Sequence, residues 1–269
     1  MERIRAAIEK ARTTRGDVKP QPAVRGMPRR ADAPARTGAW EDLREVDLDA
    51  NLLARNRVIS LDQKDKSYVA FDMIRTRLVS TCRKNNWKVV GITSPTPECG
   101  KTVTAANLCF SLSRQRDVQT VLLDCDFRRP SIAGLLGLSE TTNLESYLMG
   151  DATLQEGFVR YGLSMALSCP SMKLQQPAEL LSSQAATNAI RGMEAELAPD
   201  FVIVDLPPLG SSDDVMAFMP NLDAVILIAA AGLSTVKEID ECERELAERG
   251  NVMGVVMTKC RFTQETYGY

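Results

Sequence analysis

Three short motifs, each adjoining a run of apolar residues, constrain the fold of this chain more than any other feature. They occupy residues 94–102, 121–130 and 201–208. The apolar runs beside them are mostly β-branched, which is typical of strands buried in a parallel sheet. Because the carboxyl ends of parallel strands meet at one edge of a sheet, we expect a lysine, a hydroxyl and three carboxylates to lie together there. A nucleoside triphosphate with magnesium binds to such a set of groups.

Helical and strand patterns alternate along the chain from about residue 66 onward. Apolar spacing predicts helices over 68–84, 101–114, 177–197 with a break near Ser183, and 235–249 with a capping box formed by Thr235 and Glu238. Apolar runs predict strands over 88–93, 120–124, 163–168, 201–205, 224–229 and 252–257. This alternation predicts an α/β fold with a mainly parallel, doubly wound sheet of the P-loop NTPase type.

The first 65 residues differ in composition from the rest of the chain. We expect a short charged helix over 1–15, a flexible linker rich in Pro and Arg over 16–37, and a polar segment over 40–65. The folded domain is predicted over 66–262, followed by a short tail over 263–269. Residues 1–40 carry ten basic and four acidic residues, and the remainder is acidic. A basic N-terminal arm suits either a polyanionic or membrane-surface partner, or a solvated disordered arm without a partner.

Composition excludes several classes of chemistry. The chain has no histidine, so histidine catalysis and histidine-ligated metals are excluded. Its seven cysteines are scattered without a C-x-x-C pair, which is typical of reduced, buried thiols. We expect a soluble, cytoplasmic protein, because no apolar segment of signal-peptide type begins the chain. The longest apolar run, 224–233, is also far shorter than the ~20 residues that cross a bilayer.

The motif at 94–102 predicts a phosphate-binding loop that follows a strand and opens a helix. Lys101 can reach the β and γ phosphates, and Thr102 offers a hydroxyl ligand for Mg²⁺. The expected nucleotide contacts are Pro97, Glu98, Cys99, Gly100, Lys101, Thr102, Val103 and Asp205. Two residues depart from the usual loop: Pro95 stands in place of the first glycine, and Glu98 brings a negative side chain where a glycine is common.

Carboxylates follow the strands of the other two motifs. Asp124 and Asp126 lie two residues apart, so both face the same side if the strand continues. Asp205 ends a further strand and suits the Walker B role of holding Mg²⁺, directly or through water. Asp213 and Asp214 are interpreted as charges at a helix N-terminus, with Asp214 close enough in sequence to line the site.

In this order the motifs resemble those of the bacterial tyrosine kinases of capsule and exopolysaccharide export, over about residues 66–269. Residues 97–102 are similar to the Walker A motif of that family, 122–130 to its second motif (A-prime) and 204–208 to its Walker B motif. Residues 177–183 are similar to a Pro-x-Glu-Leu-Leu segment of the family. The stand-alone cytoplasmic members also have an N-terminal helix followed by a loose linker.

The resemblance implies an ATP- and Mg²⁺-dependent tyrosine autokinase. Catalytic roles fall to Lys101, Asp124, Asp126 and Arg128. The residues implied to hold Mg²⁺ are Thr102, Asp126 and Asp205. Asp124 is the candidate to accept the tyrosine proton, although the roles of the two aspartates can be reversed, and either Arg128 or Arg129 stabilises the transferred charge or bridges subunits. The implied phosphoacceptors, on a neighbouring subunit, are Tyr267 and Tyr269.

The resemblance also implies partners. These are the cytoplasmic tail of a membrane polysaccharide co-polymerase, which would hold the chain at the inner face of the membrane, a homo-oligomer and a tyrosine phosphatase. No nucleic acid is expected. However, the assembly helix of the family carries Glu-x-x-Arg-x-x-Arg, and Val69, Asp72 and Arg75 stand at those places here. Thr258 replaces an asparagine that reads the base in related P-loop proteins.

Two alternatives remain open at the level of sequence. One is a nucleotide-binding regulatory ATPase of a polysaccharide co-polymerase that lacks significant kinase activity. The other is an ATPase of the partition or division-site type. The phosphate loop of that group has a second lysine five positions before the conserved one, where Thr96 stands here.

Overall fold

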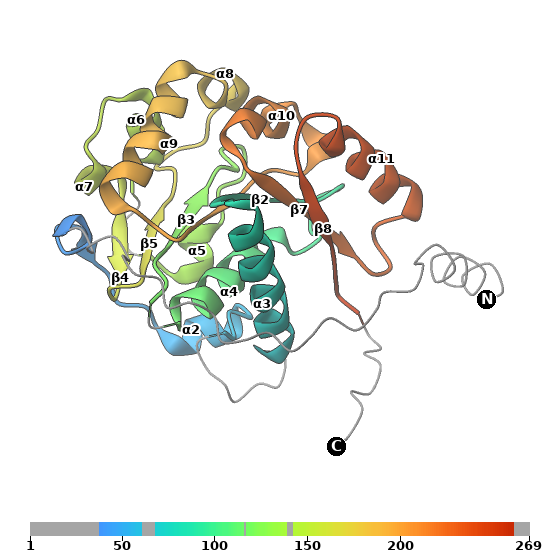
Figure 1. The fold of residues 1–269 in the computed structure, drawn as a ribbon, viewed down its shortest axis with the longest axis horizontal. Helices are drawn as coiled ribbons and strands as arrows, with labels where there is room; N and C mark the ends of the chain where they lie inside the picture. The colour runs from blue at the N-terminus through green and yellow to red at the C-terminus, as the bar shows by residue number, and fades with distance from the viewer. Residues whose placement is uncertain (1–37, 61–67, 116, 139–141, 261–269) are drawn as a thin grey trace. The chain divides into compact units, whose positions relative to one another are not determined.

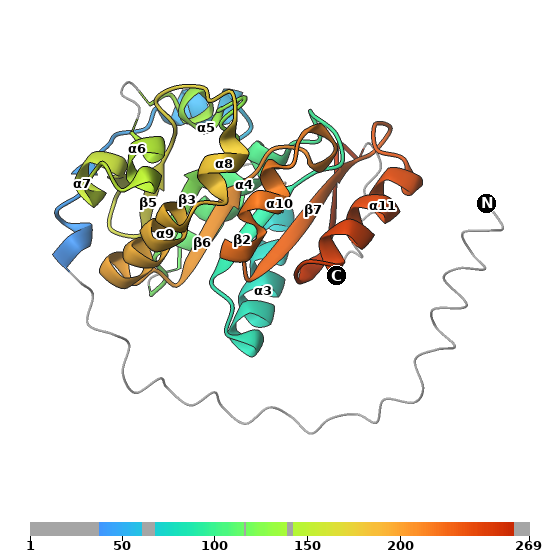
Figure 2. The same ribbon diagram turned by 90° about the horizontal axis from the view of Figure 1, so that it is seen from above.

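The computed structural model describes residues 38–60, 68–115, 117–138 and 142–260. Within these residues an eight-stranded sheet lies between two layers of helices (Figures 1 and 2). The strand order is β1 (Arg44–Glu45), β4 (Val159–Tyr161), β5 (Met165–Ser168), β3 (Thr120–Asp124), β6 (Phe201–Asp205), β2 (Val89–Thr93), β7 (Ala224–Ala230) and β8 (Val252–Thr258). Neighbouring strands are parallel except for β4 and β5, which are antiparallel. The prediction of a mainly parallel α/β fold is therefore confirmed.

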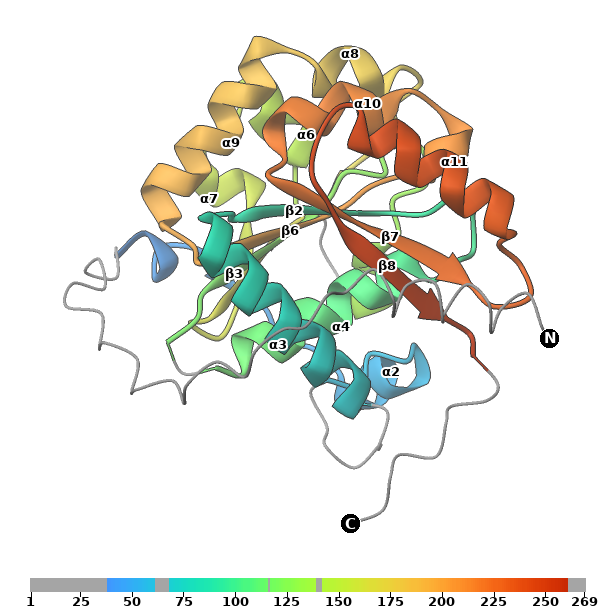
Figure 3. The same cartoon turned by 45° about the vertical axis from the view of Figure 1, so that its right-hand side comes forward.

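Each face of the sheet packs against its own set of helices, as Figure 3 shows. One core contains residues of α2 (Ala50–Arg55), α3 (Tyr68–Asn85), α4 (Lys101–Ser113) and α5 (Ile132–Leu136). The other contains residues of α6 (Leu144–Met149), α7 (Leu154–Gly157), α8 (Pro177–Leu181), α9 (Gln184–Leu197), α10 (Asp214–Phe218) and α11 (Val236–Ala247). Short 3₁₀ turns lie at η1 (Gly38–Trp40), η2 (Leu209–Ser211) and η3 (Met219–Asn221).

The central strands illustrate why apolar runs fold in this way. All five residues of β3 are buried, and successive side chains enter opposite cores: Val121 and Leu123 join one, and Leu122 joins the other. A strand covered on both faces needs apolar residues at consecutive positions. This two-sided burial is the reason that β3 and β6 have the bounds that the sequence predicts.

The N-terminal boundary of the folded unit differs from the predicted residue 66. Residues 38–60 pack on the sheet: β1 pairs with β4, and Trp40 is only 2% exposed, with its indole Nε1 donating to the Leu197 carbonyl at 2.6 Å. Leu43 and Leu53 are equally buried. These apolar residues are isolated within a polar segment, so no periodicity marks them in the sequence.

The predicted helix over 1–15, the linker over 16–37 and the tyrosine tail over 263–269 lie outside the described residues. Among the helices that are described, none is both long enough and apolar enough to cross a membrane.

Candidate functional site

The phosphate loop connects β2 to α4. It is anchored at its start by two hydroxyls, because Thr93 Oγ1 donates to the Pro207 carbonyl and Ser94 Oγ to the Thr96 carbonyl, both at 2.7 Å. Glu98 and Gly100 are left-handed, with φ values of 64° and 88°. Gly100 adopts this conformation without steric cost, whereas Glu98 does so against the preference of a residue with a Cβ. The Glu98 side chain is exposed and is part of the lining of the cavity described below.

Lys101 opens α4 and faces carboxylates. Its Nζ donates to Asp126 Oδ2 at 2.8 Å and lies 3.8 Å from Asp205 Oδ1. Burial lowers the pKa of Lys101, but attraction to Asp205 and Asp126 outweighs it and raises the pKa above its ordinary value. Lys101 is therefore a charged ammonium group held at the end of the sheet where the three motifs meet.

Asp205 is fully buried beside the start of α4. Its Oδ2 accepts a hydrogen bond from Thr102 Oγ1 at 2.6 Å, whereas its Oδ1 accepts none from any described residue. Burial raises the pKa of Asp205 to about 7, although Lys101 opposes this shift. A hydroxyl and a carboxylate with an unused oxygen are ligands that Mg²⁺ prefers. The residues present thus fit a magnesium ion.

The two aspartates of the A-prime motif have different surroundings. Asp124 has no exposed surface, and its Oδ2 accepts from the backbone N–H groups of Ser131 and Ile132 at 2.8 and 2.9 Å. Its Oδ1 accepts from the N–H of Asp126 at 3.2 Å. Burial raises the pKa of Asp124 to about 6, and the backbone donors oppose this shift. Asp124 therefore holds the loop that leads into α5, whereas Asp126 faces Lys101.

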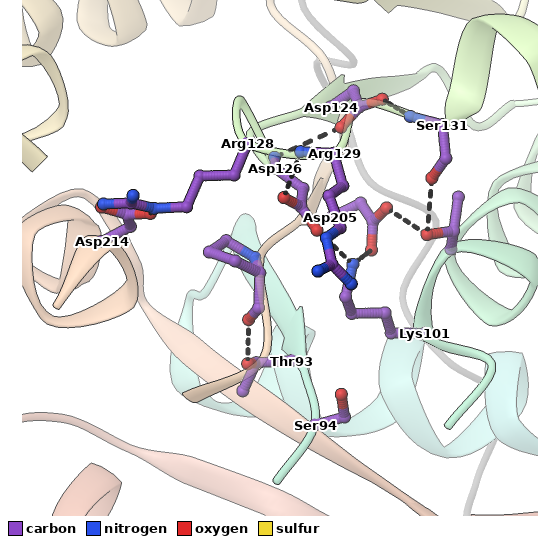
Figure 4. A network of polar contacts seen from close by, with 12 residues as sticks. Thr93, Ser94, Lys101, Asp124, Asp126, Arg128, Arg129, Ser131, Asp205 and Asp214 are labelled. Carbon is purple, nitrogen blue, oxygen red and sulfur yellow. Dashed lines mark hydrogen bonds and ion pairs between the residues drawn. The ribbon is translucent and has the colours of Figure 1, made fainter. Parts of the chain in front are cut away.

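The two arginines that follow point in different directions (Figure 4). Arg128 makes a bidentate contact with Asp214, from Nε to Oδ2 at 2.6 Å and from Nη2 to Oδ1 at 3.1 Å. Arg129 extends toward Lys101, and its guanidinium makes no hydrogen bond or ion pair with the part of the chain that the structure describes. Asp214 opens α10, as expected, and its role is to bind Arg128.

These groups surround a cavity of about 710 Å³. Of the predicted site residues, it is lined by Pro97, Glu98, Gly100, Lys101, Thr102, Val103, Asp126 and Arg128. Cys99, Asp124 and Asp205 lie behind its wall without exposed surface. Cys99 contributes through its carbonyl, which accepts from Thr258 Oγ1 at 2.6 Å. Thr258 thus supports the phosphate loop.

Sequence reasoning missed several residues of this cavity, among them Ser131 and Asn56. Ser131 lies 3.1 Å from Thr102, oxygen to oxygen, and its position directly after Arg-Arg-Pro is a signal that was available. Asn56 reaches the cavity from the N-terminal segment, where its Nδ2 donates to the Leu135 carbonyl at 2.7 Å. No motif marks Asn56 in the sequence.

The helix α3 carries the incomplete assembly pattern. Arg75 Nη1 donates to Asp72 Oδ1 at 2.8 Å and to Ser111 Oγ at 3.1 Å, so the arginine that matches the pattern is bound within the chain. Val69, at the first position of the pattern, is 44% exposed. In this conformation α3 is tied to α4 through Asp72 and Arg75.

A lysine and carboxylates gathered at the carboxyl edge of a parallel sheet, beside a loop that opens a helix, define a P-loop NTPase. The chain belongs to the ParA family, described as NUBPL iron-transfer P-loop NTPase, whose model matches residues 85–266.

Relatives narrow this assignment. The chain is 29% identical over 184 residues to the tyrosine-protein kinase CpsD of Streptococcus pneumoniae, covering 67% of this chain and 80% of that protein. It is 30% identical over 177 residues to the succinoglycan biosynthesis transport protein ExoP of Rhizobium meliloti, covering 64% of this chain but only 22% of that protein. The solved kinase domain of the Escherichia coli tyrosine kinase ETK is 26% identical, with a TM-score of 0.66 over 79% of this chain and 84% of that chain. The chain is thus a member of the bacterial tyrosine kinases, as its motifs predicted.

Proposed function

We propose that this chain is a protein-tyrosine autokinase that uses ATP and Mg²⁺ and acts in the production of a capsule or exopolysaccharide. The observation that carries the proposal is the convergence of Lys101, Thr102, Asp126 and Asp205 at one edge of the sheet, where Lys101, Thr102 and Asp126 line a common cavity. The names of the relatives support tyrosine as the acceptor and polysaccharide biosynthesis as the process.

The phosphate loop binds the triphosphate. Backbone N–H groups at the start of α4 and the ammonium group of Lys101 attract the β and γ phosphates. Lys101 exchanges its contact with Asp126 for a phosphate oxygen when ATP enters. Thr102 and Asp205 would hold Mg²⁺, since Asp205 Oδ1 is buried and accepts no hydrogen bond from any described residue, with Lys101 Nζ 3.8 Å away. When bound, Mg²⁺ neutralises charge on the phosphates.

The transfer step makes a bond between the tyrosine oxygen and the γ-phosphorus. The bond from this phosphorus to the oxygen that bridges it to the β-phosphate breaks, and its electron pair leaves with ADP. Asp126 accepts the tyrosine proton. This reverses the expectation for Asp124, whose two oxygens already accept three backbone hydrogen bonds behind the cavity wall, and it takes Asp126 out of the metal set. Positioning and charge neutralisation supply most of the catalysis.

The acceptors that we propose are Tyr267 and Tyr269 of a neighbouring copy of the chain. The partner that activates the kinase is the cytoplasmic tail of a membrane polysaccharide co-polymerase, which would place this chain at the inner face of the membrane. The ExoP relative, much longer than this chain, supports a link to such a protein. A tyrosine phosphatase would reverse the modification, and no nucleic acid takes part.

Mass spectrometry of the purified chain after incubation with ATP and Mg²⁺ tests the proposal. The partner tail is added if it can be identified, and a Lys101→Met variant is the control. Phosphate on Tyr267 or Tyr269 that disappears in the variant is the expected result. ATP binding without phosphotyrosine, even with the partner tail, would favour the regulatory ATPase.

A further inference from the structure

Two consecutive arginines stand at the mouth of the cavity, and the structure gives them different surroundings. The guanidinium of Arg128 binds both oxygens of Asp214 and also donates to the Gln175 carbonyl at 3.3 Å. The Asp214 carboxylate is only 1% exposed. A bidentate arginine–carboxylate pair has a fixed geometry, and removing Arg128 would leave a buried charge without its partner. The guanidinium of Arg128 is therefore held by Asp214 and is not free to contact a ligand in the cavity.

The guanidinium of Arg129, in contrast, makes no hydrogen bond or ion pair with any described residue. The backbone N–H of Arg129 donates to Asp126 Oδ1 at 3.0 Å, which fixes the start of its side chain beside the carboxylate that faces Lys101. Figure 4 shows the side chain directed toward Lys101, and residue 129 lines the cavity. Lys101 pairs with Asp126 and lies near Asp205. The guanidinium of Arg129 makes no ion pair with any described residue and can contact an anion that enters the cavity. This arrangement suits a phosphoryl group that carries more negative charge than Lys101 alone neutralises.

The contact between Arg128 and Asp214 also joins three segments. Arg128 belongs to the loop after β3, Asp214 opens α10, and Gln175 lies just before α8. The helices α8 and α10 pack against each other. The pair therefore fixes the loop that carries Asp126 and Arg129 to the helices on the opposite side of the cavity mouth.

We propose that Arg129 is the arginine that contacts the γ-phosphoryl group during transfer, and that Arg128 and Asp214 are positioning residues that hold the loop of Arg129 in place. The proposal rests on the proposed function, and it replaces the sequence-based expectation of a catalytic role for Arg128. An arginine that acts in this way neutralises charge on the equatorial oxygens, and it contributes far more to the transition state than to the binding of ADP.

The test compares the affinities of Mg²⁺·ADP with and without aluminium fluoride, which imitates the transferring phosphoryl group, by calorimetry on the full chain. No tyrosine is required, so the result is independent of whether the chain proves to be a kinase. Arg129→Ala is expected to lower the gain in affinity from aluminium fluoride by about 100-fold, the effect of losing one transition-state donor. Its affinity for Mg²⁺·ADP alone should stay within about threefold of wild type, which also shows that the variant is folded. Arg129→Lys should restore part of the gain.

Variants of Arg128 and Asp214 test the positioning role through the same gain in affinity from aluminium fluoride. Arg128→Ala and Asp214→Asn should each lower the gain by about tenfold, and the double variant should lose no more than either single one, because both break one contact. The exposed Arg249→Ala is a matched control and should be unchanged. Three outcomes would overturn the inference. Arg129→Ala could keep the full wild-type gain in affinity from aluminium fluoride, or Arg128→Ala could lose more of that gain than Arg129→Ala. The third outcome is a wild type whose affinity for Mg²⁺·ADP does not rise with aluminium fluoride. Absence of phosphotyrosine with a normal aluminium fluoride response would instead contradict the proposed kinase function.

Discussion

Asn107 offers the sharpest test of the finding that residues 38–60 belong to the folded unit. It lies inside α4 without exposed surface. Its Oδ1 accepts from the backbone N–H groups of Ile59 and Ser60 at 2.8 and 3.0 Å, and its Nδ2 donates to the carbonyls of Arg57 and Val103 at 2.9 and 2.8 Å. One amide thus joins the segment that carries Asn56 to the helix that carries Lys101.

Replacing Asn107 with Ala removes all four hydrogen bonds. The two N–H groups that lose their acceptor each cost about 1–3 kcal/mol when buried. Ser60 is fully buried and Ile59 only partly, so the expected loss lies near ~3 kcal/mol in total. The free energy of unfolding of a native domain is about 5–15 kcal/mol, so this loss is a large fraction of the total stability.

Urea unfolding followed by tryptophan fluorescence measures this loss, since Trp40 reports directly on the N-terminal segment. The matched control is Asn85→Ala at the exposed end of α3, which should change stability by less than about 0.5 kcal/mol. A similarly small change for Asn107→Ala would refute the reasoning that the segment is held to the core by this side chain.

Three further predictions follow from the fold. A chain that begins at residue 61 should lack the cooperative urea transition that a chain beginning at residue 38 retains, and equal transitions would contradict the role of Trp40 in the core. Gly91→Ala should lower the unfolding free energy by about 1–3 kcal/mol, measured in urea, because a Cβ there lies 2.8 Å from side-chain atoms of both Leu206 and Leu222; an unchanged midpoint would show that both leucines move freely. Hydrogen bonds from the backbone and hydroxyl of Thr235 lower the pKa of Glu238 below its ordinary value of 4.5. The ionised carboxylate therefore stabilises α11 at pH values above 4.5, and this stabilisation is lost as the pH falls through the pKa of the folded state. The difference in melting temperature between wild type and Glu238→Gln should therefore be present at pH 7 and shrink in acid, and a difference independent of pH would exclude this cause.

The sequence predicted the elements whose burial is continuous. All five residues of β6 are buried, and a run of that kind stands out in any polar context. In contrast, β4 has three residues, two of them only partly buried, and both residues of β1 are exposed. Such strands depend on pairing with neighbours that are distant in the sequence, so a local pattern cannot reveal them. The helices α6, with six residues, and α10, with five, are likewise too short for a helical period to be visible.

The sequence predicted those parts of the site that the order of strands in the sheet brings together. Lys101, Asp126 and Asp205 follow strands that are neighbours in a parallel sheet, and this order alone brings them together. The sequence could not separate Arg128 from Arg129, because consecutive residues differ only in the direction that the folded loop gives them. That direction depends on Asp214, 86 residues away from Arg128. Asn56 was invisible for a similar reason, since its place at the cavity depends on how 38–60 packs.

Transfer of phosphate between two variants of the chain tests the central claim most directly. One variant, Lys101→Met, keeps the tail tyrosines but loses the phosphate-binding ammonium group. The other keeps the site but carries Tyr267→Phe and Tyr269→Phe. After mixing with ATP, Mg²⁺ and the partner tail, we predict phosphotyrosine at residues 267 and 269 of the Lys101→Met chain and none when either variant is incubated alone. Phosphotyrosine on Lys101→Met alone, or none in the mixture when the wild type is phosphorylated under the same conditions, would contradict the account.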